Sequence, residues 1–277
     1  MRIAFTKMHG LGNDFLVMDA PADGVLPHAD QWRLLADRRA GVGFDQALVL
    51  EPPRVSGSAA HYRIFNADGG EVEQCGNGAR CIAHYLRMHG RGGADGTVSI
   101  DGAGGLVAAR LLEDGRYAVD LGVPNFEPRA LPFVATAVEA TYTLTVFGES
   151  VEFGAVAIGN PHAVVRVTAV ESAAVESIGR ALQNHPSFPR KVNVGFMQII
   201  DADHIRLRVY ERGVGETMAC GTGACAAVAV GRNLGLLAAD VEVHVRGGRL
   251  GVHWDGAGQH IWLAGPTAVA YTGQADI

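Results

Sequence analysis

The 277-residue chain has little of what marks several classes of protein. Charged residues make up 19% of it and the net charge is −6, without a cluster of lysine and arginine, so nucleic acid is not an expected partner. No apolar run approaches roughly 18 residues, which argues against a helical membrane span. The N-terminal residues lack a long apolar stretch with a small-residue cleavage site, so we expect no signal peptide.

Cysteine is scarce as well, and the four cysteines are Cys75, Cys81, Cys220 and Cys225. They are too few for a disulfide scaffold in a chain of this length. Neither close pair has the C-x2-C spacing of zinc sites, so we expect no bound metal. Thiols outside such frameworks are typical of a reducing compartment, and we predict a cytoplasmic location.

Apolar residues and glycine are plentiful by contrast. Hydrophobic residues form 48% of the sequence, enough for a substantial core, and 37 glycines help to separate short runs in which apolar and polar residues alternate. Such runs are typical of half-buried strands. The expected strands are RIAFTKM, QALVLE, YRIFNA, TVSI, YAVDL, TYTLTVF, AVVRVT, GFMQII, HIRLRVY, VEVHV and HIWLAG.

Helical patterns occur in four segments, residues 29–39, 77–90, 171–185 and 222–235. The second and the fourth each end in a glycine suited to the position after a helix C-cap. The fourth is apolar nearly all round, which places it inside a core rather than on a surface. We therefore expect strands wrapped around a buried helix in each half of the chain.

A sequence repeat relates the two halves. Residues 62–79 and 207–224 align without gaps and agree at seven of 18 positions, including the first cysteines of QCGNGARC and ACGTGAC. Upstream, LGNDF (11–15) resembles IGNPH (158–162). Each half has a Gly-Asn turn, a strand, a Gly-Glu loop and a Cys-Gly-x-Gly helix start in the same order. The repeat predicts two similar domains related by a pseudo-two-fold axis.

A cysteine at the start of a helix faces unpaired backbone N–H groups and the positive end of the helix dipole, and both favour thiolate. We therefore expect the pKa of Cys75 and of Cys220 to lie below the usual value of about 8.5. The nearby glycines let backbone N–H groups approach a carboxylate. Cys81 and Cys225 come six and five residues later, away from the first turn, and we expect them in the core.

Two such thiols on opposite sides of one carbon could remove a proton from one face and return a proton to the other. One thiol must start ionised and its partner protonated. Racemisation through pyridoxal phosphate is the main alternative, and it requires a Schiff-base lysine. Lysine occurs only as Lys7 and Lys191, and neither lies in a phosphate-cradling sequence. Direct proton transfer without a cofactor is the better hypothesis.

At this point the sequence resembles a known family. The motifs KMHGLGNDF, GFDQ, YRIFNADG, QCGNGARC, GNPH, VNVGFMQI and RVYERGVGET…CGTGACA occur in this order, and together they resemble diaminopimelate epimerases. The resemblance implies interconversion of LL- and meso-2,6-diaminopimelate by two thiols without a cofactor, in lysine and peptidoglycan precursor synthesis. It also implies a homodimer and no membrane or nucleic-acid partner.

The fold implied by the resemblance is α/β (α+β), with two pseudo-symmetric domains. Each would be a β-barrel-like sheet wrapped around a central helix, and the active site would lie in the interdomain cleft. We expect the N-terminal domain to be residues 1–120, joined by the C-terminal tail 265–277. The C-terminal domain would be residues 121–264.

Carried over to matching positions, the resemblance makes Cys75 and Cys220 the acid/base pair. The reacting carboxylate would be held by backbone N–H groups at Gly76, Asn77, Gly221 and Thr222, where many relatives have serine at the last position. The other implied substrate contacts are Asn13, Gln46, Asn66, Asn160, Asn193, Glu211 and Arg212. His162 and Glu211 match positions thought to tune the thiols, and Tyr271 matches a dimer contact.

These residue types suit diaminopimelate on chemical grounds. The substrate carries two carboxylates and two ammonium groups. Arg212 can hold the distal carboxylate through two hydrogen bonds, and Glu211 can pair with an ammonium group. Neutral asparagine and glutamine side chains supply donors and acceptors without adding charge.

Two other functions stay open at this stage. A proline or hydroxyproline racemase of the same fold would also use two cysteines, but a small imino acid would leave Glu211 and Arg212 with little to bind. A cysteine hydrolase or a redox-sensing binding protein belongs to another class, and a hydrolase would gain nothing from a second thiol.

The repeat also carries one pair of opposite charges in each half. Arg63 with Glu71, and Arg208 with Glu216, occupy matching positions. We interpret them as structural ion pairs.

Overall fold

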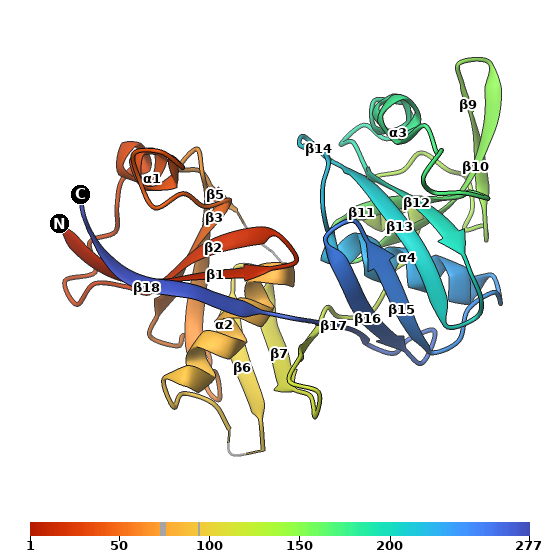
Figure 1. Cartoon of the computed structure of the whole chain (residues 1–277). Coiled ribbons are helices and arrows are strands. Elements are labelled where there is room, and N and C mark those ends of the chain that lie inside the picture. Colours follow the sequence, from red (N-terminus) through yellow and green to blue (C-terminus); the bar gives the residue numbers. More distant parts are fainter. Residues whose placement is uncertain (73–75, 94) are drawn as a thin grey trace. The chain divides into compact units, whose positions relative to one another are not determined.

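The computed structural model describes residues 1–72, 76–93 and 95–277. The chain forms two compact units (Figure 1). Unit 1 comprises Met1–Val119 and Gly265–Ile277, and unit 2 comprises Asp120–Ala264. Both mix α-helices with strands, which confirms the predicted α/β class. Among the described residues, no helix combines the length and the apolar character needed to cross a membrane.

The strands of unit 1 follow the order β18–β1–β2–β3–β4–β6–β7–β8, and the short strand β5 pairs with β4. Neighbours are antiparallel except β2–β3 and β4–β6, which are parallel. Helix α1 (Ala29–Ala36) links the first parallel pair, and α2 (Gly76–Met88) links the second. The strand bounds are β1 Arg2–Gly10, β2 Asn13–Asp19, β3 Gln46–Glu51, β4 Ala60–Asn66, β5 Glu71–Val72, β6 Thr97–Gly102, β7 Gly105–Leu111, β8 Tyr117–Asp120 and β18 Ala268–Asp276.

The strands of unit 2 follow the order β17–β16–β15–β13–β12–β11–β10–β9, and β14 pairs with β13. Here β11–β12 and β13–β15 are the parallel pairs, linked by α3 (Val175–Gln183) and α4 (Gly221–Asn233). A 3₁₀ turn at Pro128–Ala130 precedes β9. The strand bounds are β9 Tyr142–Val146, β10 Glu149–Ala157, β11 Pro161–Arg166, β12 Asn193–Ile199, β13 His204–Glu211, β14 Gly215–Glu216, β15 Asp240–Val245, β16 Gly248–Trp254 and β17 Ile261–Gly265.

The two units share strand register as well as strand order. Phe15 on β2 lies opposite Gln46 on β3, and at the matching place His162 on β11 lies opposite Asn193 on β12. These are the positions that the alignment of LGNDF with IGNPH makes equivalent. The sequence repeat is therefore a structural repeat.

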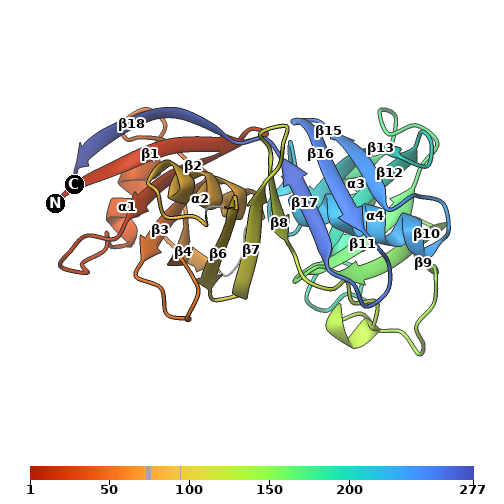
Figure 2. The ribbon, with the colours of Figure 1, turned by 90° about the horizontal axis from the view of Figure 1, so that it is seen from below.

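Each unit wraps its strands around a central helix. Helix α2 packs against β1, β2, β6 and β7, and α4 packs against β10, β11, β12, β13 and β16 (Figure 2). Every residue of α4 from Gly223 to Gly231 is buried, as its all-round apolar sequence predicts. In the described part of unit 1 no pairing joins β18 to β8, so its sheet is open where a barrel-like sheet was expected.

Both central helices end in the same way. The N–H of Gly90 donates to the Arg87 carbonyl, and the next N–H donates to the carbonyl of Leu86. The N–H groups of Gly235 and Leu236 repeat this pattern at the end of α4. The two glycines have φ values of 68° and 70°, the left-handed conformation that ends a helix in a Schellman motif. The predicted glycine termini are confirmed.

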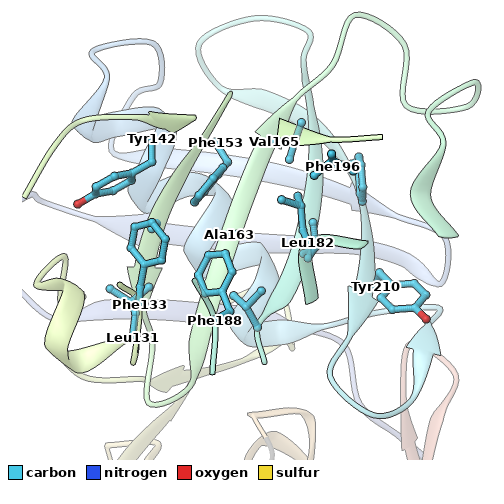
Figure 3. Close-up of a cluster of buried hydrophobic side chains, with 14 of the residues drawn as sticks. Leu131, Phe133, Tyr142, Phe153, Ala163, Val165, Leu182, Phe188, Phe196 and Tyr210 are labelled. Atoms are coloured by element: carbon cyan, nitrogen blue, oxygen red, sulfur yellow. The ribbon is translucent and has the colours of Figure 1, made fainter. Parts of the chain in front are cut away.

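A second hydrophobic layer covers the other face of the unit 2 sheet, beneath α3. Its centre is aromatic (Figure 3): the Phe133 ring stacks on Phe188 with centroids 4.7 Å apart and meets Tyr142 edge-on at 4.8 Å. In unit 1, Trp32 of α1 stacks on Phe65 of β4 at 5.1 Å. The outer helices are thus attached to their sheets by large apolar contacts.

The repeated opposite charges form ion pairs. Arg63 donates two hydrogen bonds of 2.7 Å to the Glu71 carboxylate. Arg208 donates two hydrogen bonds, of 2.7 and 2.8 Å, to Glu216. Each pair joins a long strand to the short strand just before the central helix, which confirms the structural interpretation.

The close packing of α4 on β10 gives a stability prediction. A Cβ atom added at Gly154 would lie only 2.3 Å from Cγ1 of Val230. We expect Gly154→Ala to lower the free energy of unfolding by about 1–3 kcal/mol through overpacking, measured by urea denaturation. Gly195→Ala on β12 is the control, because its added Cβ meets Leu207 Cδ1 at an ordinary 3.4 Å. Equal losses in the two variants would contradict this account.

Candidate active site

Cys220 lies where the chain enters α4. Its backbone is extended, it occupies the N-cap position, and its side chain is buried with 5% exposure. Its Sγ lies 3.6 Å from the hydroxyl of Thr222. Helix α4 begins at Gly221. The thiol of Cys220 therefore lies at the first turn, whose backbone N–H groups have no acceptor within the helix. Cys81 and Cys225 are fully buried within the central helices, as expected for core residues.

The pKa of Cys220 differs from the expectation. Burial raises it well above the usual value, and the nearby Glu211 carboxylate raises it further. Hydrogen bonds to the Thr222 hydroxyl and the Gly223 N–H act in the opposite direction but do not prevail. The prediction of a lowered pKa was therefore wrong for Cys220, because desolvation of the thiolate outweighs the helix start.

Asn193 organises the neighbouring polar groups in unit 2. It is the first residue of β12, buried to 3% exposure, and its amide donates to the carbonyl of Pro161 at 3.0 Å. Its Oδ1 accepts the backbone N–H of Arg212 at 2.9 Å. The Glu211 carboxylate, at the end of β13, accepts a 2.5 Å hydrogen bond from the hydroxyl of Thr217, a partner that the sequence did not indicate.

Arg212 carries an exposed guanidinium, whose Nη1 lies 3.4 Å from the carbonyl of Arg190. Within the described residues it forms no ion pair with a carboxylate, unlike Arg206 and Arg208 of the preceding strand β13. It is thus available for an acidic ligand.

His162 is the most buried ionisable group of this set, with 1% exposure. Its Nε2 lies 2.8 Å from Oδ1 of Asn160, in the turn before β11, whereas its Nδ1 has no hydrogen-bond partner among the described residues. Burial, and after it the charge of Arg212, lowers the pKa of His162 to about 3. The ring is therefore neutral near pH 7.

Unit 1 brings together the matching residues that the structure describes. The Asn77 amide, in the first turn of α2, donates to Oδ1 of Asn13 at 3.2 Å. Gln46, the first residue of β3, donates to Oδ1 of Asn66 at 2.9 Å. The Oε1 atom of Gln46 is buried and accepts no hydrogen bond from the described residues.

Gly76 is the first residue of α2, at the place that Gly221 occupies in α4. Cys75 precedes it and lies outside the described residues. Tyr271 lies on β18, where it pairs with Lys7 of β1 and its hydroxyl is 3.4 Å from the carbonyl of Val42.

The polar groups of the two units occupy four equivalent places. These are the Gly-Asn pair that leads into β2 or β11, the first residue of β3 or β12, the last residue of β4 or β13, and the first turn of α2 or α4. In each unit these residues thus lie at the same end of the strands, beside the start of the central helix. A shallow hollow of about 800 Å³ along α3, lined by Ser177 and Arg208 among others, includes none of them.

A cluster of charges borders the unit 1 group and was not singled out in the sequence. Lys7, Asp14, Arg38 and Asp45 form it, and Asp45 accepts a 2.9 Å hydrogen bond from the Asn13 amide. Asp14 lies within the motif LGNDF and Asp45 within the motif GFDQ. These motifs are the sequence features from which the two carboxylates could have been predicted as site residues.

Solved structures define the class of fold. A hydroxyproline epimerase from Agrobacterium vitis superposes with a TM-score of 0.71 at 16% identity, over 99% of this chain and 92% of that chain. A PhzF-family phenazine biosynthesis protein from Bacillus anthracis gives a TM-score of 0.68 at 16% identity, over the whole of both chains. At such identities the likeness establishes the fold alone.

Sequence comparison defines the family. The family model described as diaminopimelate epimerase matches residues 5–127 and 154–275. Diaminopimelate epimerase of Chromobacterium violaceum is 50% identical over the full length of both chains. That of Alkalilimnicola ehrlichii is 51% identical over 99% of both. The chain therefore belongs to the diaminopimelate epimerase family, whose members are isomerases.

The position of Glu211 gives a prediction for the thiol. In a Cys75→Ala background we expect Glu211→Gln to lower the pKa of Cys220, because a neutral amide no longer opposes the thiolate. The measurement is the pH titration of thiolate ultraviolet absorbance. Glu176→Gln, on the exposed face of α3, is the matched control and should leave the titration unchanged. A Glu211→Gln titration equal to that of its parent would contradict the assigned cause.

The buried, neutral His162 gives a pH prediction. Its pKa is about 3 when folded, whereas an unfolded histidine has a pKa of about 6.5. Between these values the unfolded state binds a proton that the folded state does not, so stability falls as the pH falls through this window. The contribution reaches about 1.4 kcal/mol per pH unit.

We expect His162→Gln to remove this part of the pH dependence, as measured by urea unfolding across the window. His9→Gln, at an exposed position on β1, should retain it. A parallel pH dependence in the native chain and the His162→Gln variant would contradict the assignment.

Proposed function

We propose that this chain interconverts LL- and meso-2,6-diaminopimelate, as an enzyme of lysine and peptidoglycan precursor synthesis, by direct proton transfer without a cofactor. Cys75 and Cys220 form the acid/base pair. The observation that carries the proposal is a Cys-Gly-x-Gly-Ala helix start at equivalent positions of two units with the same topology and register. Identity of 50% to a full-length relative of that name supports the choice of substrate.

The reaction balances with two thiols and no other reagent. The thiolate of one cysteine takes the α-proton as the C–H bond breaks. The thiol of the other gives its proton to the opposite face of the carbon, which inverts the centre. Afterwards the first cysteine is a thiol and the second a thiolate, and the reverse reaction exchanges their roles.

The raised pKa of Cys220 bears on its role in the proposed reaction. Burial and the Glu211 carboxylate favour the protonated thiol of Cys220, the form in which it acts as the acid. Once Cys220 has given up its proton, the same desolvation and negative charge favour its reprotonation.

Backbone N–H groups at the two helix starts stabilise the transition state. Negative charge moves from the α-carbon onto the reacting carboxylate as the proton leaves. The N–H groups of Gly221 and Thr222, with those of Gly76 and Asn77, hold this carboxylate where that charge develops. Fixed donors in a water-poor site are worth more than the same hydrogen bonds in water.

The remaining polar groups recognise the distal end of the substrate. Arg212, without an ion-pair partner in the described structure, binds the distal carboxylate, and Glu211 pairs with an ammonium group. The buried Oε1 of Gln46 accepts a further N–H of the substrate. Asn13, Asn66, Asn160 and Asn193 complete the contacts, and neutral His162 shapes the environment of Cys220 without adding charge.

We also propose a homodimer that works in the cytoplasm. Tyr271 of β18 is 46% exposed, and its ring meets the buried ring of Phe5 edge-on at 5.9 Å, so an exposed but oriented aromatic side chain supports a role in subunit contact. A reducing compartment keeps the thiols in the state that the reaction requires. Each domain, residues 1–120 with 265–277 and residues 121–264, supplies one thiol.

The test is turnover in deuterated water. LL-diaminopimelate should gain one solvent deuterium at the inverted α-carbon. Cys75→Ala and Cys220→Ala should each lower kcat by about 10²–10⁴-fold or more, because each removes one proton-transfer group. Cys225→Ala, which changes a buried cysteine of the same helix as Cys220, is the control and should retain kcat.

Three outcomes would contradict the proposal. Absence of deuterium would exclude epimerisation, and turnover of proline instead would favour an imino-acid racemase. Loss of activity on replacing only one of the two cysteines would favour a single-thiol enzyme such as a hydrolase.

A further inference from the structure

Four charged residues of unit 1 form a connected cluster. The Lys7 ammonium donates to the Asp14 carboxylate at 2.6 Å and to the carbonyl of Gly43. Arg38 donates two hydrogen bonds to Asp14, of 2.9 and 2.8 Å, and a third to Oδ1 of Asp45 at 2.9 Å. Two cations and two carboxylates thus neutralise one another.

The inner half of the cluster is enclosed and the outer half is exposed. The side chain of Lys7 is 9% exposed and that of Asp14 is 17% exposed, whereas those of Arg38 and Asp45 are 59% and 43% exposed. Burial alone would raise the pKa of Asp14, but hydrogen bonds from Arg38 and Lys7 hold that pKa well below its usual range. The Lys7–Asp14 pair holds one arrangement, because breaking it leaves an uncompensated buried charge, and Asp14 in turn anchors Arg38 and Asp45.

Asp45 connects the cluster to the polar group described above. Its Oδ2 accepts the side-chain N–H of Asn13 at 2.9 Å and the backbone N–H of Asp14 at 3.1 Å. The Oδ1 of Asn13 accepts from the Asn77 amide at 3.2 Å. A carboxylate can only accept, so Asn13 must turn its nitrogen toward Asp45 and its oxygen toward Asn77.

The cluster belongs to only one of the two repeats. By strand register, Lys7, Asp14 and Asp45 correspond to Ala155, Pro161 and Val192 of unit 2. There Asn160, the equivalent of Asn13, has its Oδ1 2.8 Å from Nε2 of His162 instead. The shared topology therefore does not require these charges, which points to a task specific to the unit 1 site.

We propose that Asp45, held in place by Arg38 and Asp14, is a positioning residue that fixes the amide of Asn13 in the orientation that binds the substrate. This inference rests on the proposed function, in which Asn13 contacts diaminopimelate. Asp45 acts through Asn13 and touches no reacting atom. Its loss should weaken substrate binding more than it slows proton transfer.

Asp45→Asn is the sharpest test. Oδ1 of Asp45 faces Arg38 and Oδ2 faces Asn13, so an amide with one donor end cannot accept from both. If the new side-chain NH₂ at position 45 faces Asn13, the Asn13 amide must rotate to accept from it. The nitrogen of Asn13 then faces the side-chain nitrogen of Asn77, and their hydrogen bond is lost. We expect KM for LL-diaminopimelate to rise by about tenfold, the effect of one good hydrogen bond, with kcat within about threefold of native.

A second measurement does not depend on turnover. In the Cys220→Ala background, calorimetry should give a Kd for diaminopimelate that Asp45→Asn raises by about tenfold. Glu171→Gln is the matched control, because it removes a carboxylate from the exposed ion pair with Arg206 in unit 2. It should change neither KM nor Kd.

The outcomes separate the inference from the proposed function. An unchanged KM and Kd in Asp45→Asn would overturn the inference alone. A fall in kcat at constant KM, with a lower unfolding temperature, would also overturn it, because a merely structural cluster reduces the folded fraction. Failure of the native chain to turn over diaminopimelate, or of its Cys220→Ala form to bind it, would overturn the proposed function and this inference with it.

Discussion

The enclosure of α4 is the constraint on which the rest of this structure depends. A helix with apolar residues on every side cannot lie at a surface, so strands must cover it all round. Close contact requires small residues in the surrounding strands, and Gly154 meets that need where β10 passes Val230. The start of the enclosed helix then lies among the ends of the surrounding strands, where Cys220 is almost fully buried. The thiol's chemistry is thus a consequence of how the core is built.

The same constraint explains where the polar side chains come from. Strands around α4 begin or end near its first turn: β11 and β12 begin beside Asn160 and Asn193, and β13 ends at Glu211, so residues far apart in sequence meet at one place. Repetition of this arrangement supplies a second set in unit 1. In unit 2 the neutral ring of His162 contacts Asn160, whereas in unit 1 the carboxylate of Asp45 orients the equivalent Asn13. Equal topology therefore coexists with unequal electrostatics.

The sequence predicted the four helices, eleven strands and the internal repeat, because alternation and glycine termini are local signals. The sequence missed β2, β5, β7, β14 and β16. It did not indicate β10, whose last five residues are buried between α4 and the outer layer and so do not alternate. It also did not indicate β18, which is exposed along most of its length and is defined by pairing with β1. The pKa of Cys220 was mispredicted because burial is a tertiary property. Asp45 was overlooked for the same reason, since its partners come from two other segments of the chain, residues 13–14 and Arg38.

The pairing of β18 with β1 also affects synthesis. Residues 268–276 pair with the first strand, yet they follow all of unit 2 in the chain. A ribosome therefore releases the complementary edge of unit 1 only after unit 2 has been translated. Until then β1 carries an unpaired row of backbone donors and acceptors, the kind of edge that nascent chains must shield from aggregation. Unit 2 has no such delay, so it can finish folding before the unit that was begun first.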